Sequence, residues 1–279
     1  MSATGQSVAS QAKSLALSPR ARLLLGDTAY VVAPILVCLI VWELIAKFSG
    51  FPKILFPPLE DIFGALGRMY AEGTLYSDVK ATFGRLLYSV LIGCVVGTVA
   101  GALMGSFRSC ERAMVGPVNF LLAVPGTALF PLTMMWFGLT EAAILSILMY
   151  EVALTVTTNT WSGVKTIDVS LIRAGRAFGA RGPALFRRVL LPAALPSIIT
   201  GYRLGLSRAW RILIVAEMLV SASSGLGYRL YWARELFQTD VVYAGLLVVG
   251  TAGLLLERVI LRTVEAYTVQ RWGTVRELD

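Results

Sequence analysis

The feature that most constrains this chain is a series of six apolar stretches, each about long enough to cross a lipid bilayer. They cover about residues 28–48, 86–107, 115–137, 142–161, 196–221 and 241–261 of the 279-residue sequence. A transmembrane helix needs roughly 20 predominantly apolar residues. The chain is 56% hydrophobic and 15% charged, whereas soluble proteins average about 45–50% and about 25%. We therefore expect an all-α membrane protein with about six transmembrane helices.

The remaining composition excludes several classes of protein. Three cysteines are an odd number, and Cys38 and Cys94 lie inside apolar stretches, which excludes a disulfide-stapled secreted scaffold. The absence of histidine excludes histidine metal sites and histidine general bases. The sequence also has no G-x-x-x-x-G-K-[ST] motif for binding nucleotide phosphates. We expect a non-catalytic chain that binds no metal and no nucleic acid.

The distribution of the basic residues predicts the topology. With the N-terminus inside, the segments on the cytoplasmic side carry 15 of the 25 Lys and Arg residues, and the outer segments carry seven. Because cytoplasmic loops are enriched in Lys and Arg, we expect both termini in the cytoplasm. The predicted division is a cytoplasmic tail at 1–27, a first transmembrane helix with an external amphipathic segment at 28–82, a core at 83–265 and a cytoplasmic tail at 266–279.

Two apolar stretches carry unusual small or rigid residues. Residues 86–107 hold Gly93, Gly97, Gly101 and Gly105 at intervals of four, which favours close packing against another helix. Residues 115–137 hold three prolines, including Pro125, which predict a bent or broken helix. Such a helix lines a pathway or is simply kinked, and the sequence does not separate these alternatives.

The fifth apolar stretch contains three arginines. We place Arg208 near the bilayer midplane, because a helix rises about 1.5 Å per residue from the start of the stretch. A charge at that depth must face protein or water. It therefore lines a path for an anion or forms an ion pair with Glu151, Glu217 or Glu43. The candidate pathway residues are Arg203, Arg208, Arg211, Glu151 and Pro125.

The segment 162–195 is the longest predicted cytoplasmic loop and has helical periodicity. Glycines at 179 and 182 divide it into two short amphipathic helices, and Pro192 and Pro196 are expected to end it where the next span begins. The expected apolar stripe consists of Leu171, Ala174, Phe178, Leu185, Phe186 and Val189. Paired amphipathic helices on the cytoplasmic face suit docking to a soluble partner or resting on the inner leaflet.

The loop resembles the "EAA" motif of the permease subunits of binding-protein-dependent ABC importers. That motif reads EAA, three residues, Gly, nine residues, an aliphatic residue, one residue and Leu-Pro. Here Arg173-Ala174-Gly175 precedes Gly179, Val189 and Leu191-Pro192 at the same spacings. Further segments resemble the branch that imports sulfonates, taurine and nitrate, among them Gly201-Tyr202-Arg203-Leu204, Ala216-Glu217-Met218 and Gly225-Leu226-Gly227-Tyr228.

The resemblance implies a type I ABC importer permease fold and a role in coupling. It implies that ATP and Mg are bound by a separate pair of ATP-binding subunits, and that an external substrate-binding protein delivers the solute. A second permease subunit, which we expect to be another copy of this chain, would complete the pathway in the bacterial inner membrane. The implied coupling residues are Arg173, Ala174, Gly175, Phe178, Gly179, Ala180, Val189, Leu191 and Pro192. Arg173 and Gly175 depart from the family's acidic first residue and third alanine.

The function expected from these features is transport of a small, anionic organic solute such as a sulfonate, taurine, nitrate or an aromatic carboxylate. The alternative is a carrier or channel that moves small anions without ATP. Such a carrier typically has paired carboxylates at the midplane or inverted repeats. Glu43 and Glu151 could form such a pair, but the two halves of the sequence show no repeat.

Overall fold

The structure, a computed structural model, describes residues 19–220 and 223–257, with side chains from residue 33 onward. All secondary structure in this part of the chain is helical, as the sequence predicts. The predicted tails at 1–27 and 266–279 both lie entirely outside the described side chains. The chain forms two compact units, residues 1–61 and 62–279.

The first unit contains α2 (Pro19–Phe48), which ends at the residue where the first apolar stretch ends. The chain then turns back on the helix. The Trp42 indole donates a hydrogen bond of 3.1 Å to the carbonyl oxygen of Pro57, and the N–H of Leu59 donates one of 2.9 Å to the Glu43 carboxylate. Glu43 also forms an ion pair with Lys47. Its carboxylate therefore holds the start of the next helix.

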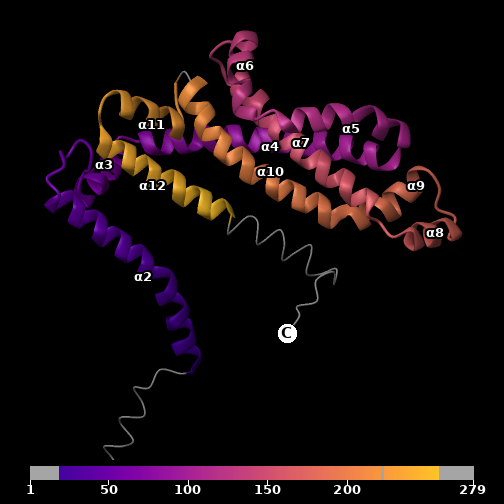
Figure 1. Cartoon of the computed structure of the whole chain (residues 1–279), viewed down its shortest axis with the longest axis horizontal. Coiled ribbons are helices and arrows are strands. Elements are labelled where there is room, and N and C mark those ends of the chain that lie inside the picture. Colours follow the sequence, from indigo (N-terminus) through magenta and orange to yellow (C-terminus); the bar gives the residue numbers. More distant parts are fainter. Residues whose placement is uncertain (1–18, 221–222, 258–279) are drawn as a thin grey trace, which may run out of the picture. The chain divides into compact units, whose positions relative to one another are not determined.

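The second unit is a bundle of helices, drawn in Figure 1. The helix α3 (Leu59–Ala71) crosses the boundary between the two units. The elements that follow are α4 (Thr74–Ser106), α5 (Arg108–Ala123), η1 (Gly126–Leu129), α6 (Phe130–Phe137), α7 (Glu141–Lys165), α8 (Val169–Ala177), α9 (Pro183–Leu185), η2 (Phe186–Leu190), α10 (Leu191–Val220), α11 (Leu226–Glu235) and α12 (Thr239–Leu255).

The core of the bundle surrounds α7, which packs along both α4 and α10. Fully buried side chains of α7, such as Leu148 and Val152, meet Leu213 and Ala216 of α10 in one apolar cluster. The residue numbers of facing positions increase in the same direction along α4 and α7, so these two helices run parallel. Along α7 and α10 they increase in opposite directions, so these two helices run antiparallel. The bundle therefore has two ends, which we name the α8 end and the α11 end after the short helices found there.

In the described part of the chain three helices are long and apolar enough to cross a membrane: α4, α7 and the continuous helix Pro183–Val220. The helix α5 and the segment Gly126–Phe137 meet the same criterion only when taken together as one span, and they are bent by 88° at the break between them. This break, at Pro125, confirms the bent helix predicted from the prolines. The described part of α12 is apolar but only 17 residues long.

Two sequence predictions about helix boundaries are wrong. The helix α4 begins at Thr74, twelve residues before the apolar stretch. The reason is that polar residues of its first turns, including Asp78 and Thr82, are buried. Pro192 and Pro196 also do not end a helix, since Pro183–Val220 is continuous. A π turn precedes Pro192, and such turns change the hydrogen-bond register where proline has no N–H to donate.

Candidate functional site

The candidate coupling segment consists of α8 and the turn after it, residues 168–182. Asp168 begins the segment, because its carboxylate accepts a hydrogen bond of 2.8 Å from the N–H of Ser170. This bond holds the pKa of Asp168 below its usual value. After α8 the chain turns at Gly179 and Gly182, whose φ angles are +83° and +51°. Only glycine adopts this region readily, so the turn depends on both positions.

The helix α8 packs against the start of the continuous helix Pro183–Val220 through Gly175, which has no side chain. A Cβ on Gly175 would lie 2.8 Å from Cγ2 of Val189 and 3.3 Å from Cδ1 of Leu185. The alanine typical of the motif would therefore not fit here without a shift. Leu185 is buried, whereas Leu171 and Phe178 are exposed. The predicted apolar stripe is thus divided: one part packs inside the chain and the other faces outward.

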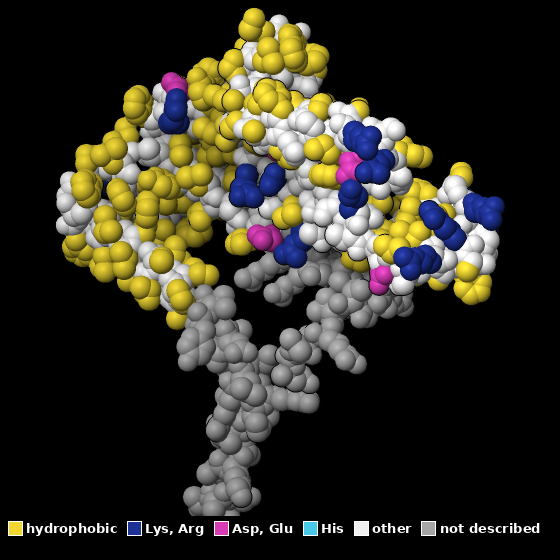
Figure 2. Space-filling model, turned by 45° about the vertical axis from the view of Figure 1, so that its right-hand side comes forward, with side chains coloured by type: hydrophobic (Ala, Val, Ile, Leu, Met, Phe, Trp, Pro, Cys, Tyr) yellow, Lys and Arg dark blue, Asp and Glu magenta, His cyan; other side chains and the backbone are white. Residues whose placement is uncertain are grey.

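The exposed surface of α8 carries an aromatic ring and positive charge. Phe178 is 92% exposed, and Arg173 and Arg176 are also exposed. Figure 1 shows α8 beyond the ends of α7 and α10. In Figure 2 dark blue side chains gather toward this end of the bundle. The face is open to a partner, although the docking role of the individual residues stays a prediction.

The four glycines at 93, 97, 101 and 105 face α7. Added Cβ atoms on Gly97 and Gly101 would lie 2.6 Å and 2.5 Å from carbonyl oxygens of Ala153 and Thr157. On Gly93 and Gly105 they would lie 2.6 Å and 2.5 Å from the Cβ atoms of Val152 and Val164. The backbones of α4 and α7 therefore approach closely along four turns, and no larger residue fits.

The three arginines of α10 are exposed. Arg208 lies near the middle of α7, where its guanidinium is 3.4 Å from the hydroxyl of Thr155. Arg211 donates a hydrogen bond of 3.2 Å to the carbonyl oxygen of Ser207. Glu217, one of the three acids considered as a partner of Arg208, pairs elsewhere, and Glu43 pairs with Lys47.

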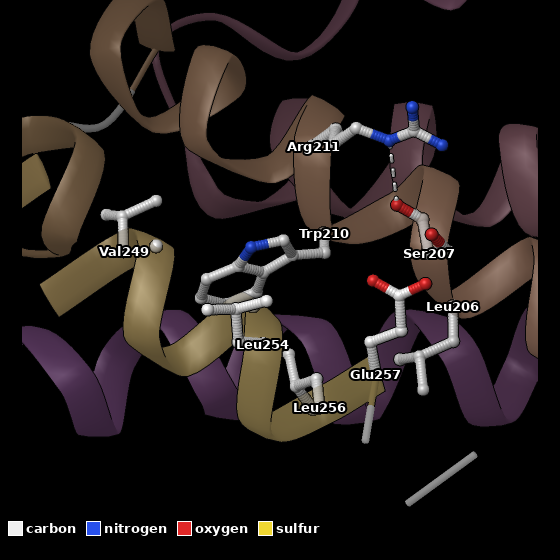
Figure 3. A pocket seen from close by; sticks show the side chains of 10 residues that line it. Leu206, Ser207, Trp210, Arg211, Val249, Leu254, Leu256 and Glu257 are labelled. Atoms are coloured by element: carbon white, nitrogen blue, oxygen red, sulfur yellow. Dashed lines mark hydrogen bonds between the residues drawn. The ribbon is translucent and has the colours of Figure 1, made fainter. Parts of the chain in front are cut away.

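Arg211 also lines a cavity of about 420 Å³ between α10 and α12 (Figure 3). Its walls combine apolar and polar groups, among them Trp210, Ser207 and Glu257. Of these lining residues, only Arg211 is among the pathway candidates from the sequence. Glu151 lies next to the proline break, since a Cβ on Gly126 would be 2.8 Å from Oε1 of Glu151.

The α11 end contains a network of charges in which Arg85 and Glu217 are buried and Glu141 is exposed. The guanidinium of Arg85 donates to both oxygens of Glu141, at 2.6 and 2.5 Å, and to Glu217 at 2.6 Å. Glu217 is fully buried and also accepts bonds from the hydroxyl of Thr82 and the N–H of Gly227. The predicted apolar stretch begins one residue after Arg85, so no helix was expected at Asp78 and Thr82. The spacing of Asp78, Thr82 and Arg85 along one helix face is the signal that could have extended the predicted helix back to them.

The same network holds the segment that begins α11. Asp78 is buried, and it accepts a hydrogen bond of 3.0 Å from the N–H of Gly225 and one of 2.8 Å from Arg229. Gly225 has φ +132°, and a Cβ there would lie 2.6 Å from the carboxyl carbon of Glu217. Four helices, α4, α7, α10 and α11, are therefore tied together by charge-assisted hydrogen bonds.

Residues 93–267 match the family model of the binding-protein-dependent transport system inner membrane component. The putative aliphatic sulfonates transport permease protein SsuC of Escherichia coli is 36% identical over 81% of this chain and 89% of its own length. The taurine transport system permease protein TauC of the same organism is 30% identical over 81% and 84%. A putative ABC transporter permease protein of Methanocaldococcus jannaschii is 33% identical over 83% and 88%.

Solved structures share the fold at lower identity. The inward-facing methionine ABC transporter MetNI superposes with a TM-score of 0.59 at 23% identity, covering 68% of this chain and 96% of that chain. A bacterial alginate ABC transporter in complex with a periplasmic protein gives 0.59 at 13%, covering 90% and 98%. These similarities support the helical bundle described above.

Proposed function

This chain belongs to the family of binding-protein-dependent transport system inner membrane components and is a permease subunit of an ABC importer, and from this premise we propose how it works. The proposal is that α8 couples the chain to a separate ATP-binding subunit, which carries the nucleotide and Mg. The observation that carries it is the open face of α8, with Phe178 almost fully exposed at the tip of the bundle.

The bundle is suited to transmit a movement of α8. The close contacts between α4 and α7 and the continuous helix from Pro183 to Val220 link the α8 end to the rest of the unit. A displacement of α8 therefore moves packed helices rather than a loose loop. Closure of two ATP-binding subunits would draw two such segments together and switch the pathway between its inward and outward openings.

The proposed substrate is a small organic anion. Arg208 and Arg211 expose their guanidinium groups on a membrane helix, and such charges are too costly to face lipid. That face of α10 must therefore be covered by a second copy of the chain or line a water-filled path. A sulfonate or carboxylate would be attracted to such a lining. The relatives named for aliphatic sulfonates and taurine transport agree with this class.

Co-purification of the chain with its ATP-binding subunit tests the coupling role. We expect Gly179→Asp to abolish association, because aspartate strains the turn and adds a charge beside Phe178. Gly73→Asp is the matched control, since Gly73 has φ +73°, is exposed at the other end and has open space around its Cα. Retention of the ATP-binding subunit by the Gly179 variant would overturn the assignment of α8.

A further inference from the structure

The coupling segment carries an unusually one-sided charge. Between residues 166 and 190 the chain has one acid, Asp168, and five arginines at positions 173, 176, 181, 187 and 188. The acid is occupied as the N-cap of α8. All five arginines are exposed. None of the five forms an ion pair with any residue in the described part of the chain.

The position of Arg173 directs this charge away from the chain's own bundle. Gly175 packs against Val189, and a residue two positions earlier lies about 200° around the helix from it. Arg176 is three residues on, so the two guanidinium groups share one exposed edge of α8. Phe178 is five residues on from Arg173, which is about 140° around the helix, so its almost fully exposed ring lies on a different side of α8 from the two arginines. The helix α8 thus exposes an aromatic ring on one side and, on another, two arginines that form no ion pair within the described residues.

We propose that α8 docks into a groove of the ATP-binding subunit that has an apolar pocket for Phe178 and a rim of Asp and Glu facing Arg173 and Arg176. The inference rests on the proposed function, and it adds the chemistry of the partner and the basis of its selection. Complementary charges steer association and reject partners of the same sign. A subunit with a basic groove, suited to an acidic coupling helix, would therefore not pair with this chain.

A lipid surface is the other anionic surface within reach, but the structure favours the protein. The helix α8 lies beyond the ends of the long helices, at the tip of the bundle (Figure 1). It is joined to the rest of the unit through a turn that projects Phe178 outward. The exposed apolar patch formed by Leu171 and Phe178 is small, and it matches a pocket better than the broad apolar face with which helices lie on membranes.

The test uses the complex of this chain with its ATP-binding subunit in nanodiscs of phosphatidylcholine, which carry no net lipid charge. We expect Arg173→Glu to weaken binding of the ATP-binding subunit at least tenfold, and Arg173→Lys to retain it. Binding by the unaltered chain should weaken as salt rises from 50 to 500 mM, because exposed charges are screened. Equal binding by Arg173→Glu, or binding indifferent to salt, would overturn the proposal.

Cross-linking identifies the partner's groups directly. A carbodiimide joins lysine amines to carboxylates, so Arg173→Lys should become linked to an Asp or Glu of the ATP-binding subunit. The native Lys80, exposed on α4 near the α11 end, is the internal control and should not link to that subunit. Changing the linked acid to lysine should rescue Arg173→Glu.

The outcomes separate this inference from the proposed function. If the unaltered chain binds an ATP-binding subunit but Arg173→Lys links to none of its carboxylates, only the acidic groove is wrong. If the unaltered chain binds no ATP-binding subunit at all, the coupling role itself fails.

Discussion

The α11 end and the α8 end of the bundle differ in whether their charged side chains are buried and paired. At the α11 end Arg85 and Glu217 are buried and paired, and Asp78 holds the start of α11. At the α8 end five arginines are exposed, and none forms an ion pair within the described residues. Charges satisfied inside the chain fix a structure, whereas unsatisfied charges at the surface are available to a partner. We infer from this difference that the α11 end stabilises the fold and that the α8 end binds the partner.

Removing Arg85 should produce the largest loss of stability. Arg85→Ala leaves the Glu217 carboxylate buried without its ion pair, which typically costs about 3–5 kcal/mol. Thermal unfolding in detergent should show a clearly lower midpoint. Arg176→Ala at the other end is the control and should leave the midpoint unchanged while weakening partner binding. An Arg85 variant as stable as the native chain would remove the contrast between the two ends.

A larger residue in the glycine contact between α4 and α7 should cause the next largest loss of stability. Gly97→Val places a branched side chain where even a Cβ would lie 2.6 Å from a backbone oxygen of α7, and overpacking costs about 1–3 kcal/mol. The unfolding midpoint should fall, and uptake should fall with it. Gly84→Ala on the same helix meets open space and should be neutral or slightly stabilising. Similar effects of the two substitutions would contradict the packing argument.

The arginine at mid-bundle should affect transport and leave stability intact. Arg208→Gln removes a charge that makes a long contact, of 3.4 Å, with the hydroxyl of Thr155, so the unfolding midpoint should not move. Uptake of an anionic solute should fall about tenfold, the effect of losing one charged hydrogen bond of about 1.5 kcal/mol. Arg208→Lys should retain part of the uptake. Normal uptake by the Gln variant would exclude this arginine from the pathway.

The smallest expected effect is local and depends on pH. Asp168 has a lowered pKa in the folded chain because Ser170 donates a hydrogen bond to its carboxylate. The capping contribution is therefore present above the ordinary aspartate pKa and is lost as the pH falls through the lowered value. Asp168→Ala should speed amide hydrogen exchange within α8 severalfold at pH 7 without changing the global midpoint. The difference between variant and native chain should shrink in acid.

The sequence predicted the parts of this structure that depend on local pattern. The glycine spacing, the break at Pro125, the short helix of the external segment and the divided coupling loop all follow from periodicity and from the two residues that constrain the backbone most, glycine and proline. The same information failed where distant residues meet. Asp78, Thr82 and Arg85 look like loop residues because hydropathy counts charge and ignores the partner that neutralises it.

The continuous helix at 183–220 also shows that local sequence pattern does not decide where a helix ends. Proline at positions 192 and 196 predicts a boundary, but a π turn and packing against α7 and α4 carry the helix through both. The cavity beside Arg211 was also beyond sequence reasoning, since its walls come from two helices about 40 residues apart. Tertiary contacts therefore decided what local preference could not.

The most direct test of the account is solute uptake by proteoliposomes that contain the purified chain, with and without its ATP-binding subunit. Taurine, butanesulfonate and nitrate are the probes, offered together with the external binding protein from the same cells. The account predicts uptake of at least one anion that requires both ATP and the ATP-binding subunit and that is lost with Gly179→Asp. Uptake by the chain alone, without ATP, would contradict it and establish a carrier instead.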